Sequence, residues 1–506
     1  MSTLTRNLLS NVVERGISTI LTLVVLPFQV RLLGIDAYGI LGFVASLQVL
    51  FNILDLGLGP TVIREIASSS VAAKPRSTQR PLFESLTTVY WAIALASGVV
   101  LAGSARWIAV HWLQAGTLPT ETVVLAIRLI AMSVLLRWPV ALYAGAMAGA
   151  QRLDLVNVIR IIVSVLKLLG GLAVLVYSRA LMPYLLWLTL VSLLEIGMYM
   201  FMSIRVVPGL SLRAGFSRAA LGDIWRFSLH MNLMSMLAVL FVQADRMVIS
   251  RILPVAELGF YSVAYSIVTG LSMLQNIVTA ALFPALAQHV SRGQWTEIRT
   301  RCRTAVQLLM YVLCGITCVL IFYGRDLLGA WISADVAARS AVPTAILAVG
   351  FTLAAAVSVP YTLSVAAGRT GVPLVVNILA IVVYLPAIYW AVQSWGISGA
   401  AWSWLGLNTY YLLVLLPLMQ RNIPMEPMFG WVVRNLCVFG GLGIVAVGAS
   451  HLLSGNVRGP LPAVAGAIGG GLAYAAVGFL FLEPSLHRRL KNWRTTLITL
   501  TPHGPP

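Results

Sequence analysis

The chain has 506 residues, of which 59% are hydrophobic and only 10% are charged, whereas soluble domains carry roughly 25% charged residues. This composition excludes an ordinary soluble protein, because no soluble core needs so much apolar surface. The formal net charge of +18 would suggest nucleic acid as a partner of a soluble protein. Here, however, the basic residues lie mostly at the ends of apolar segments, so we expect a membrane protein without a nucleic-acid partner.

Apolar runs of about 20 residues, each long enough to cross a bilayer as a helix, follow one another along the whole chain. The first run is interrupted by Glu14 and Arg15 and has no small-residue cleavage site, so we expect it to remain as a helix rather than to be removed as a signal peptide. Hydropathy predicts an all-α polytopic protein with about fourteen transmembrane helices. They are expected near residues 10–33, 38–63, 82–104, 122–147, 154–177, 181–204, 227–250, 257–287, 303–323, 341–367, 372–392, 396–419, 431–453 and 461–482.

The distribution of basic residues predicts the orientation. An even number of helices puts both termini on one side, and the positive-inside rule makes the more basic side cytoplasmic. One set of alternate loops, with the termini, carries Arg6, Lys74, Arg76, Arg80, Arg152, Arg205, Arg213, Arg218, Arg292, Arg299, Arg301, Arg369, Arg421, Arg488, Arg489, Lys491 and Arg494. The other set carries Arg31, Arg106, Arg179, Arg251, Arg325, Arg339 and Arg458. We therefore expect both termini to be cytoplasmic.

An internal repeat emerges when the chain is compared with itself at an offset of about 220 residues. Arg31-Leu32-Leu33 with Tyr38-Gly39 corresponds to Arg251-Ile252-Leu253 with Leu258-Gly259, and Val156-Asn157-Val158 corresponds to Val376-Asn377-Ile378. Six helices in each copy favour two lobes related by an axis along the membrane normal, with a substrate site between them. The expected parts are an N-lobe at 1–204, a cytoplasmic linker at 205–226, a C-lobe at 227–420, two extra helices at 421–482 and a basic cytoplasmic tail at 483–506.

Charged residues inside predicted helices need a cavity or a partner, because a charge at the bilayer centre costs about 2.5 to 3.5 kcal/mol even on a lenient scale. Arg160 and Lys167 share one face of the helix predicted at 154–177, together with Asn157 and Ser164. Polar stripes on the predicted first and seventh helices carry Arg15 and Arg246. These stripes favour a water-filled cationic cavity.

Two arginines of one predicted helix are candidates for the cavity lining, but they are not expected to line it together. Arg128 and Arg137 are nine residues apart and therefore lie on opposite faces of a straight helix, and we expect the more central Arg137 to line the cavity. The predicted substrate-binding residues are Arg15, Arg137, Arg160, Lys167 and Arg246. The carboxylates available for coupling to a proton or sodium gradient are Asp55, Asp245, Glu195 and Glu14. The alternative is that these carboxylates form structural ion pairs with the cations. No Cys/His cluster has metal-ligand spacing, and we expect no metal and no cofactor.

Several short motifs together form a recognisable pattern: Phe28-Gln29-Val30-Arg31-Leu32-Leu33-Gly34, Asp36-Ala37-Tyr38-Gly39, Asp55-Leu56-Gly57-Leu58-Gly59, Arg64-Glu65-Ile66-Ala67, Asp245-Arg246, Gly259-Phe260-Tyr261 and Phe283-Pro284. This pattern resembles the polysaccharide transporter family, the Wzx-type O-antigen flippases within the multidrug/oligosaccharidyl-lipid/polysaccharide exporter superfamily. It implies two six-helix lobes around a central cavity and alternating access. The implied activity is transfer of an undecaprenyl-pyrophosphate-linked oligosaccharide to the outer leaflet of the cytoplasmic membrane. Implied partners are the lipid-linked oligosaccharide, membrane lipid, and the polymerase and glycosyltransferases of the same pathway.

Three alternatives stay open at this point. A lipid II flippase would share the fold and the pyrophosphate, whereas a multidrug exporter handles organic cations that a cationic cavity repels. An O-antigen polymerase or ligase is an enzyme that needs a sizeable outer loop for its catalytic residues, and the outer loops expected here are short. We therefore expect a transporter and not an enzyme.

Overall fold

The computed structural model describes residues 3–51, 62–63, 66, 76–114, 116, 118–207, 215, 217, 236–421, 423, 427–454 and 460–483. Throughout these residues the regular secondary structure is helical, and they contain no β-strand. A helix satisfies the hydrogen-bonding groups of its own backbone, which an apolar membrane interior requires. The predicted all-α fold class is confirmed.

The chain divides into two compact units. Unit 1 comprises Met1–Ile267 and Asn377–Ser403, and unit 2 comprises Val268–Val376 and Trp404–Pro506. The lobes expected at 1–204 and 227–420, with the linker between them, stay predictions.

Unit 1 is built mainly from the N-terminal helices. They are α1 (Thr3–Leu33), α2 (Ile35–Phe51), α4 (Arg76–Trp107) with a π turn at Ile108–Trp112, α5 (Thr120–Arg137), α6 (Val140–Gly149), α7 (Leu153–Val165), a π turn at Leu166–Gly170, α8 (Gly171–Ser178) and α9 (Leu181–Val206). Residues 236–252 are also helical. The beginning of α11 (Val255–Ser291) and the middle of α14 (Gly371–Tyr410) belong to this unit as well.

Unit 2 contains the remainder of α11 and α14 and most of the C-terminal helices. The latter are α12 (Trp295–Trp331), α13 (Ala334–Ala366), a π turn at Tyr411–Leu415, α15 (Leu416–Gln420), α16 (Phe429–Ser454) and α17 (Pro460–Leu480).

Among the described residues, 11 helices are long and apolar enough to cross a membrane. The chain is therefore a multi-pass membrane protein. The α14 helix joins two helices across a kink at Gly396, whose backbone is non-helical (φ 59°, ψ −141°). The apolar α2 has 17 residues, slightly short of a full span. The expected number of about fourteen helices stays a prediction.

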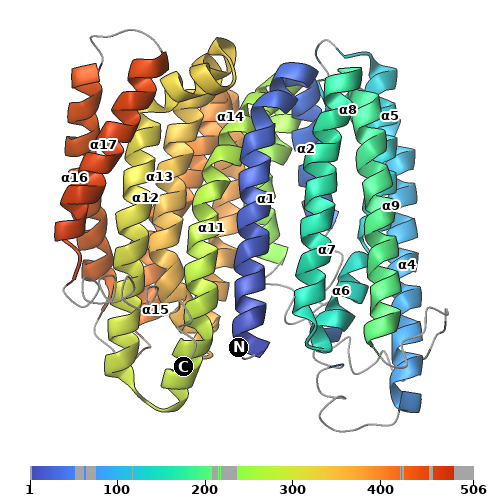
Figure 1. Ribbon diagram of the computed structural model, residues 1–506, viewed down its shortest axis with the longest axis horizontal. Helices are drawn as coiled ribbons and strands as arrows, with labels where there is room; N and C mark the ends of the chain where they lie inside the picture. Colours follow the sequence, from blue (N-terminus) through green and yellow to red (C-terminus); the bar gives the residue numbers. More distant parts are fainter. Residues whose placement is uncertain are drawn as a thin grey trace, which may run out of the picture. The chain divides into compact units, whose positions relative to one another are not determined.

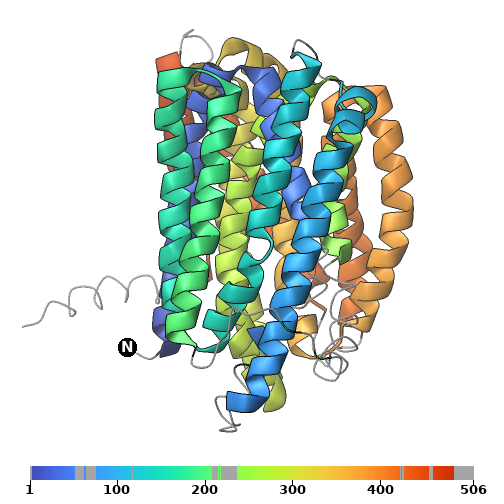
Figure 2. The same ribbon diagram turned by 90° about the vertical axis from the view of Figure 1, so that its right-hand side faces the viewer.

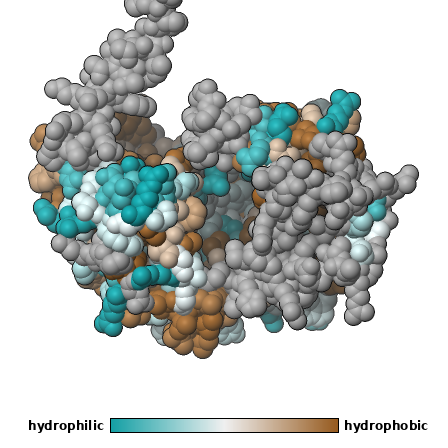
Figure 3. Space-filling view, turned by 90° about the horizontal axis from the view of Figure 1, so that it is seen from below, coloured by the Kyte–Doolittle hydropathy of each residue, from teal (hydrophilic) through white to brown (hydrophobic). Residues whose placement is uncertain are grey.

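The long spans of unit 1, with α5 continuing into α6 and α7 into α8, run side by side (Figure 2). The turn before α7 carries Arg152 and the end of α9 carries Arg205, which puts both at the same end of the unit. Arg106, in the last turn of α4, and Arg179, directly after α8, lie at the opposite end. Figure 3 looks onto the end at which α9 terminates, where hydrophilic and hydrophobic side chains are both visible. Which end faces the cytoplasm stays a prediction.

Two glycines let α2 and the beginning of α11 approach each other closely within unit 1. A Cβ atom on Gly39 would collide with the carbonyl group of Val255, and a Cβ atom on Gly259 would collide with the carbonyl group of Ile35. Gly39 and Gly259 are the residues that correspond in the two copies of the sequence repeat. The two motifs therefore meet in space, which gives these glycines a structural role.

In unit 2, α16 and α17 lie side by side and both pack against α12 (Figure 1). A Cβ atom on Gly443 of α16 would lie 2.6 Å from Cys318 Sγ of α12. The Tyr474 hydroxyl of α17 donates to the Tyr311 carbonyl of α12 at 2.6 Å. The last two helices therefore pack onto α12 through glycines and neutral hydrogen bonds.

Candidate functional site

A cavity of about 530 Å³ lies inside unit 1. Its lining comes from α1, α2, α5, α6, α7, α9 and the π turn that follows α7. The charged residues in the lining are Glu14, Arg137, Arg160, Lys167 and Glu195. Three cations and two carboxylates thus share one space within helices that are otherwise apolar.

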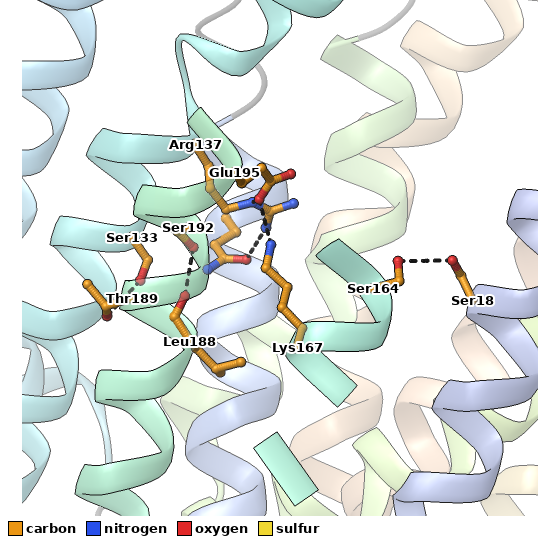
Figure 4. Close-up of polar contacts among 10 residues, drawn as sticks. Ser18, Ser133, Arg137, Ser164, Lys167, Leu188, Thr189, Ser192 and Glu195 are labelled. Atoms are coloured by element: carbon orange, nitrogen blue, oxygen red, sulfur yellow. Dashed lines mark hydrogen bonds and ion pairs between the residues drawn. The ribbon is translucent and has the colours of Figure 1, made fainter. Parts of the chain in front are cut away.

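Glu195 of α9 pairs with two of these cations through one oxygen atom. Its Oε2 lies 2.7 Å from Lys167 Nζ and 3.3 Å from Arg137 Nε. Figure 4 shows the ammonium and guanidinium groups converging on this carboxylate. The Glu195 side chain is 9% exposed, whereas that of Lys167 is 20% and that of Arg137 is 41% exposed. The cations are therefore more accessible than the carboxylate that neutralises them.

A helix break positions Arg137. It occupies the last turn of α5, and Pro139, which has no backbone N–H group, follows before α6 begins. The break is visible in Figure 2. Carbonyl groups at a helix C-terminus favour a cation. Arg137 Nη1 also donates to Gln48 Oε1 at 2.9 Å, and Trp138 Nε1 donates to the Phe51 carbonyl at 3.1 Å. These two bonds tie the break to α2.

A π turn positions Lys167. The turn spans Leu166–Gly170 and interrupts the span Leu153–Ser178 near its middle. A π turn disturbs the regular helical hydrogen bonds and is frequent at functional sites. Here Trp187 Nε1 of α9 donates to the Leu166 carbonyl at 2.9 Å. A Cβ atom on Gly170 would collide with the Trp187 ring. The indole therefore stabilises the irregular turn, and glycine gives it the space to do so.

The remaining charged lining residues, Arg160 and Glu14, have neutral partners among the described residues. Arg160 lies near the Tyr199 side chain, whose hydroxyl donates to the Val156 carbonyl at 3.3 Å. The Ser18 hydroxyl lies 3.4 Å from Glu14 Oε1 and 3.0 Å from Ser164 Oγ, so it links α1 to α7 (Figure 4). The polar stripes predicted on the first and fifth helices therefore face each other.

Not all predicted site residues reach this cavity. The structure brings together Arg137, Arg160, Lys167, Glu195 and Glu14. Arg15 is not among the residues that line the described cavity, nor is Arg128, the alternative to Arg137. Asp55 lies outside the described residues.

The predicted pair Asp245 and Arg246 lies elsewhere in unit 1. Asp245 is 1% exposed and accepts hydrogen bonds from the Tyr261 hydroxyl at 2.6 Å and from the backbone N–H group of Arg246 at 2.7 Å. The Arg246 guanidinium lies over the Tyr265 ring, 3.8 Å from its centroid. Neither residue lines the described cavity.

Sequence reasoning missed two polar residues of the site, Gln48 and Tyr199. Tyr199 is four residues after Glu195 and so lies on the same helical face, a spacing that the sequence does carry. Gln48 is a polar residue near the end of an apolar segment, and only the position of Arg137 gives it a role.

The chemistry that this arrangement supports is the binding of an anion. Guanidinium and ammonium groups donate charge-assisted hydrogen bonds to phosphate or carboxylate oxygens. No group of His, Cys, Asp and Glu among the described residues could hold a metal ion.

The sequence is similar to known proteins over most of its length. The family model for "Polysaccharide biosynthesis protein" matches residues 4–290. A protein of Shigella flexneri described as "Putative O-antigen transporter" is 23% identical over 405 residues, which cover 79% of this chain and 93% of that protein.

The fold is also that of solved membrane transporters. The lipid II flippase MurJ in an inward closed conformation aligns with a TM-score of 0.71 at 12% identity, over 94% of this chain and 98% of that structure. An inward-facing multidrug transporter of the MATE family aligns with a TM-score of 0.65 at 13% identity, over 84% and 99%. These relatives are transporters rather than enzymes. The chain therefore belongs to the polysaccharide biosynthesis protein family and has the fold of membrane transporters.

Proposed function

We propose that the protein is a flippase that carries an undecaprenyl-pyrophosphate-linked oligosaccharide, an O-antigen or exopolysaccharide repeat unit, from the inner to the outer leaflet of the cytoplasmic membrane by alternating access. The observation that carries this proposal is the charged cavity of unit 1, where three cations face two carboxylates. A surplus cation inside a membrane protein calls for an anionic partner. Guanidinium forks match phosphate oxygens in particular.

The alternatives differ in what the cavity would have to bind. A drug exporter for organic cations would be disfavoured by the surplus of positive charge, because like charges repel across a recognition surface. A lipid II flippase would need the same pyrophosphate chemistry. The similarity to the Shigella flexneri protein supports the O-antigen type of substrate.

Complementation tests this choice. The full chain is expressed in a strain without its O-antigen flippase and, separately, in a strain depleted of its lipid II flippase. We expect surface polysaccharide to return in the first strain and growth not to be rescued in the second. Rescue of growth alone would assign the protein to lipid II instead.

Orientation is part of the same proposal, with both termini and the turn between α11 and α12 in the cytoplasm. A variant without the four native cysteines carries a single new one, either R292C in that turn or R339C near the beginning of α13. Both arginines are exposed. We expect a membrane-impermeant maleimide to label R339C in intact cells and R292C only after permeabilisation. Labelling of R292C in intact cells would reverse the orientation.

A further inference from the structure

Glu195 competes with any anion that enters the cavity. Its Oε2 accepts a hydrogen bond from Lys167 Nζ at 2.7 Å and forms an ion pair with Arg137 Nε at 3.3 Å, and an incoming phosphate oxygen would bind the same groups. We propose that Glu195 is an internal counter-anion, which holds Lys167 and Arg137 in the empty cavity and is displaced from them when the phosphate of the substrate binds. This inference rests on the proposed function and identifies Glu195 as the residue that adjusts the affinity for the substrate.

The geometry leaves room for a second anion beside Glu195. Arg137 uses Nε for Glu195 and Nη1 for Gln48, and a guanidinium has five N–H donors. Lys167 has three donors, of which one points to Glu195. The Glu195 side chain is 9% exposed, and the side chains of both cations are more exposed. A phosphate can therefore approach the cations from the cavity before it displaces Glu195 from them.

The charge balance explains why a transporter would keep such a carboxylate. The cavity lining carries one net positive charge, because it has three cations, Arg137, Arg160 and Lys167, and two carboxylates, Glu14 and Glu195. A pyrophosphate diester carries one negative charge on each phosphate, so with both carboxylates in place the substrate meets competition. When the substrate leaves, Glu195 pairs again with Lys167 and Arg137, which avoids unpaired charges in a buried site. Glu195 thus lowers affinity for the substrate and eases its release.

Glu14 provides a matched control. It lines the same cavity, but its oxygen lies near the Ser18 hydroxyl and forms no ion pair with a cation among the described residues. Replacing either glutamate by glutamine removes one negative charge from the cavity. Only replacement of Glu195 also releases Lys167 and Arg137 from direct contact.

The test measures binding of farnesyl pyrophosphate to the purified full chain in lipid nanodiscs, with uncharged farnesol as the reference ligand. We expect Glu195→Gln to bind farnesyl pyrophosphate about tenfold more tightly than the wild type, Glu14→Gln to differ by about threefold or less, and farnesol binding to be unchanged, because a charge-assisted contact is stronger than a neutral one. Where Glu195→Gln fails to fold, Glu195→Asp replaces it, since the shorter side chain reaches the two cations less well. The expected change for that variant is about threefold.

The outcomes separate this inference from the proposed function. If the wild type binds farnesyl pyrophosphate and the Glu195 variants bind no more tightly than it does, or no more tightly than Glu14→Gln, the counter-anion role is wrong and the proposed function stands. If neither the wild type nor any Glu195 variant binds farnesyl pyrophosphate, both proposals are rejected.

Discussion

The cavity of unit 1 and the α12, α16 and α17 cluster of unit 2 both bury polar groups among apolar side chains, but they satisfy them with different partners. In the cavity, Glu195 pairs with Lys167 and Arg137. In the cluster, the Tyr323 hydroxyl lies 3.2 Å from Ser450 Oγ and 3.0 Å from Ser454 Oγ. Ion pairs leave each partner able to bind another charged group, whereas neutral hydrogen bonds between tightly packed helices mainly fix their positions. The comparison agrees with the ligand binding that we propose for the cavity and indicates a supporting role for the cluster.

The largest expected effect is on transport, from loss of a cavity cation. Arg160→Ala and Lys167→Ala should each lower polysaccharide export about tenfold to hundredfold, because a charge-assisted contact is worth about 1.5 to 3 kcal/mol. Export is measured in cells without the native flippase and normalised to the amount of variant in the membrane. Arg128→Ala, which removes an exposed arginine from α5, is the control and should export normally. Full export by well-expressed Arg160→Ala and Lys167→Ala variants would reject the cationic site.

The same export assay tests how far the substrate-binding site extends beyond the cavity. The sequence predicts comparable losses for Arg15→Ala and Arg246→Ala, yet neither residue lines the described cavity. Losses as large as those of Arg160→Ala would extend the substrate path beyond the cavity, whereas near-normal export would confine it.

In unit 2 the expected effect is on stability. A Cβ atom on Gly466 of α17 would lie 2.5 Å from the Tyr323 hydroxyl and 2.8 Å from Ser454 Oγ, whereas nothing lies within 4 Å of a Cβ atom on Gly469. Overpacking costs about 1 to 3 kcal/mol, so Gly466→Val should lower the thermal unfolding midpoint of the purified protein. Gly469→Val should leave it nearly unchanged. Export per folded molecule should be normal in both variants, and a selective loss of export in Gly466→Val would contradict the supporting role.

The smallest effect is expected from the π turn. Trp187→Phe removes the hydrogen bond to the Leu166 carbonyl, which is worth about 0.5 to 1.5 kcal/mol, and should lower export about two- to tenfold through misplacement of Lys167. Trp402→Phe, which alters an exposed indole of the same unit, is the control. If export falls no further in Trp187→Phe than in Trp402→Phe, the turn does not position Lys167.

Sequence reasoning could predict the parts of the site that depend on helical periodicity. Arg160, Ser164 and Lys167 recur every three or four residues, and the structure places all three in the lining. The sequence could not show that Glu195, Lys167 and Arg137 meet. That contact depends on how α5, α9 and the π turn pack together, and helical spacing does not contain this information.

The membrane-protein class and the helical fold follow from composition, because a bilayer leaves few other structures possible.

The closeness of Asp245 and Arg246 in the sequence favours an ion pair between their side chains. The structure instead gives the Asp245 carboxylate to Tyr261 and to a backbone N–H group, and the Arg246 guanidinium to the Tyr265 ring. Neighbouring residues on a helix point in directions about 100° apart, so adjacency in sequence is a poor guide to pairing.

The π turn at Leu166–Gly170 also bears on how such a cavity can change between related proteins. A π turn holds one residue more than the α-helical turn that it replaces. Deletion of a single residue there would restore a regular helix, while α7 and α8 on either side would keep the faces that they present. One codon lost at this point would therefore move the turn that carries Lys167 and leave Arg160 in place, without any substitution in the residues that line the cavity.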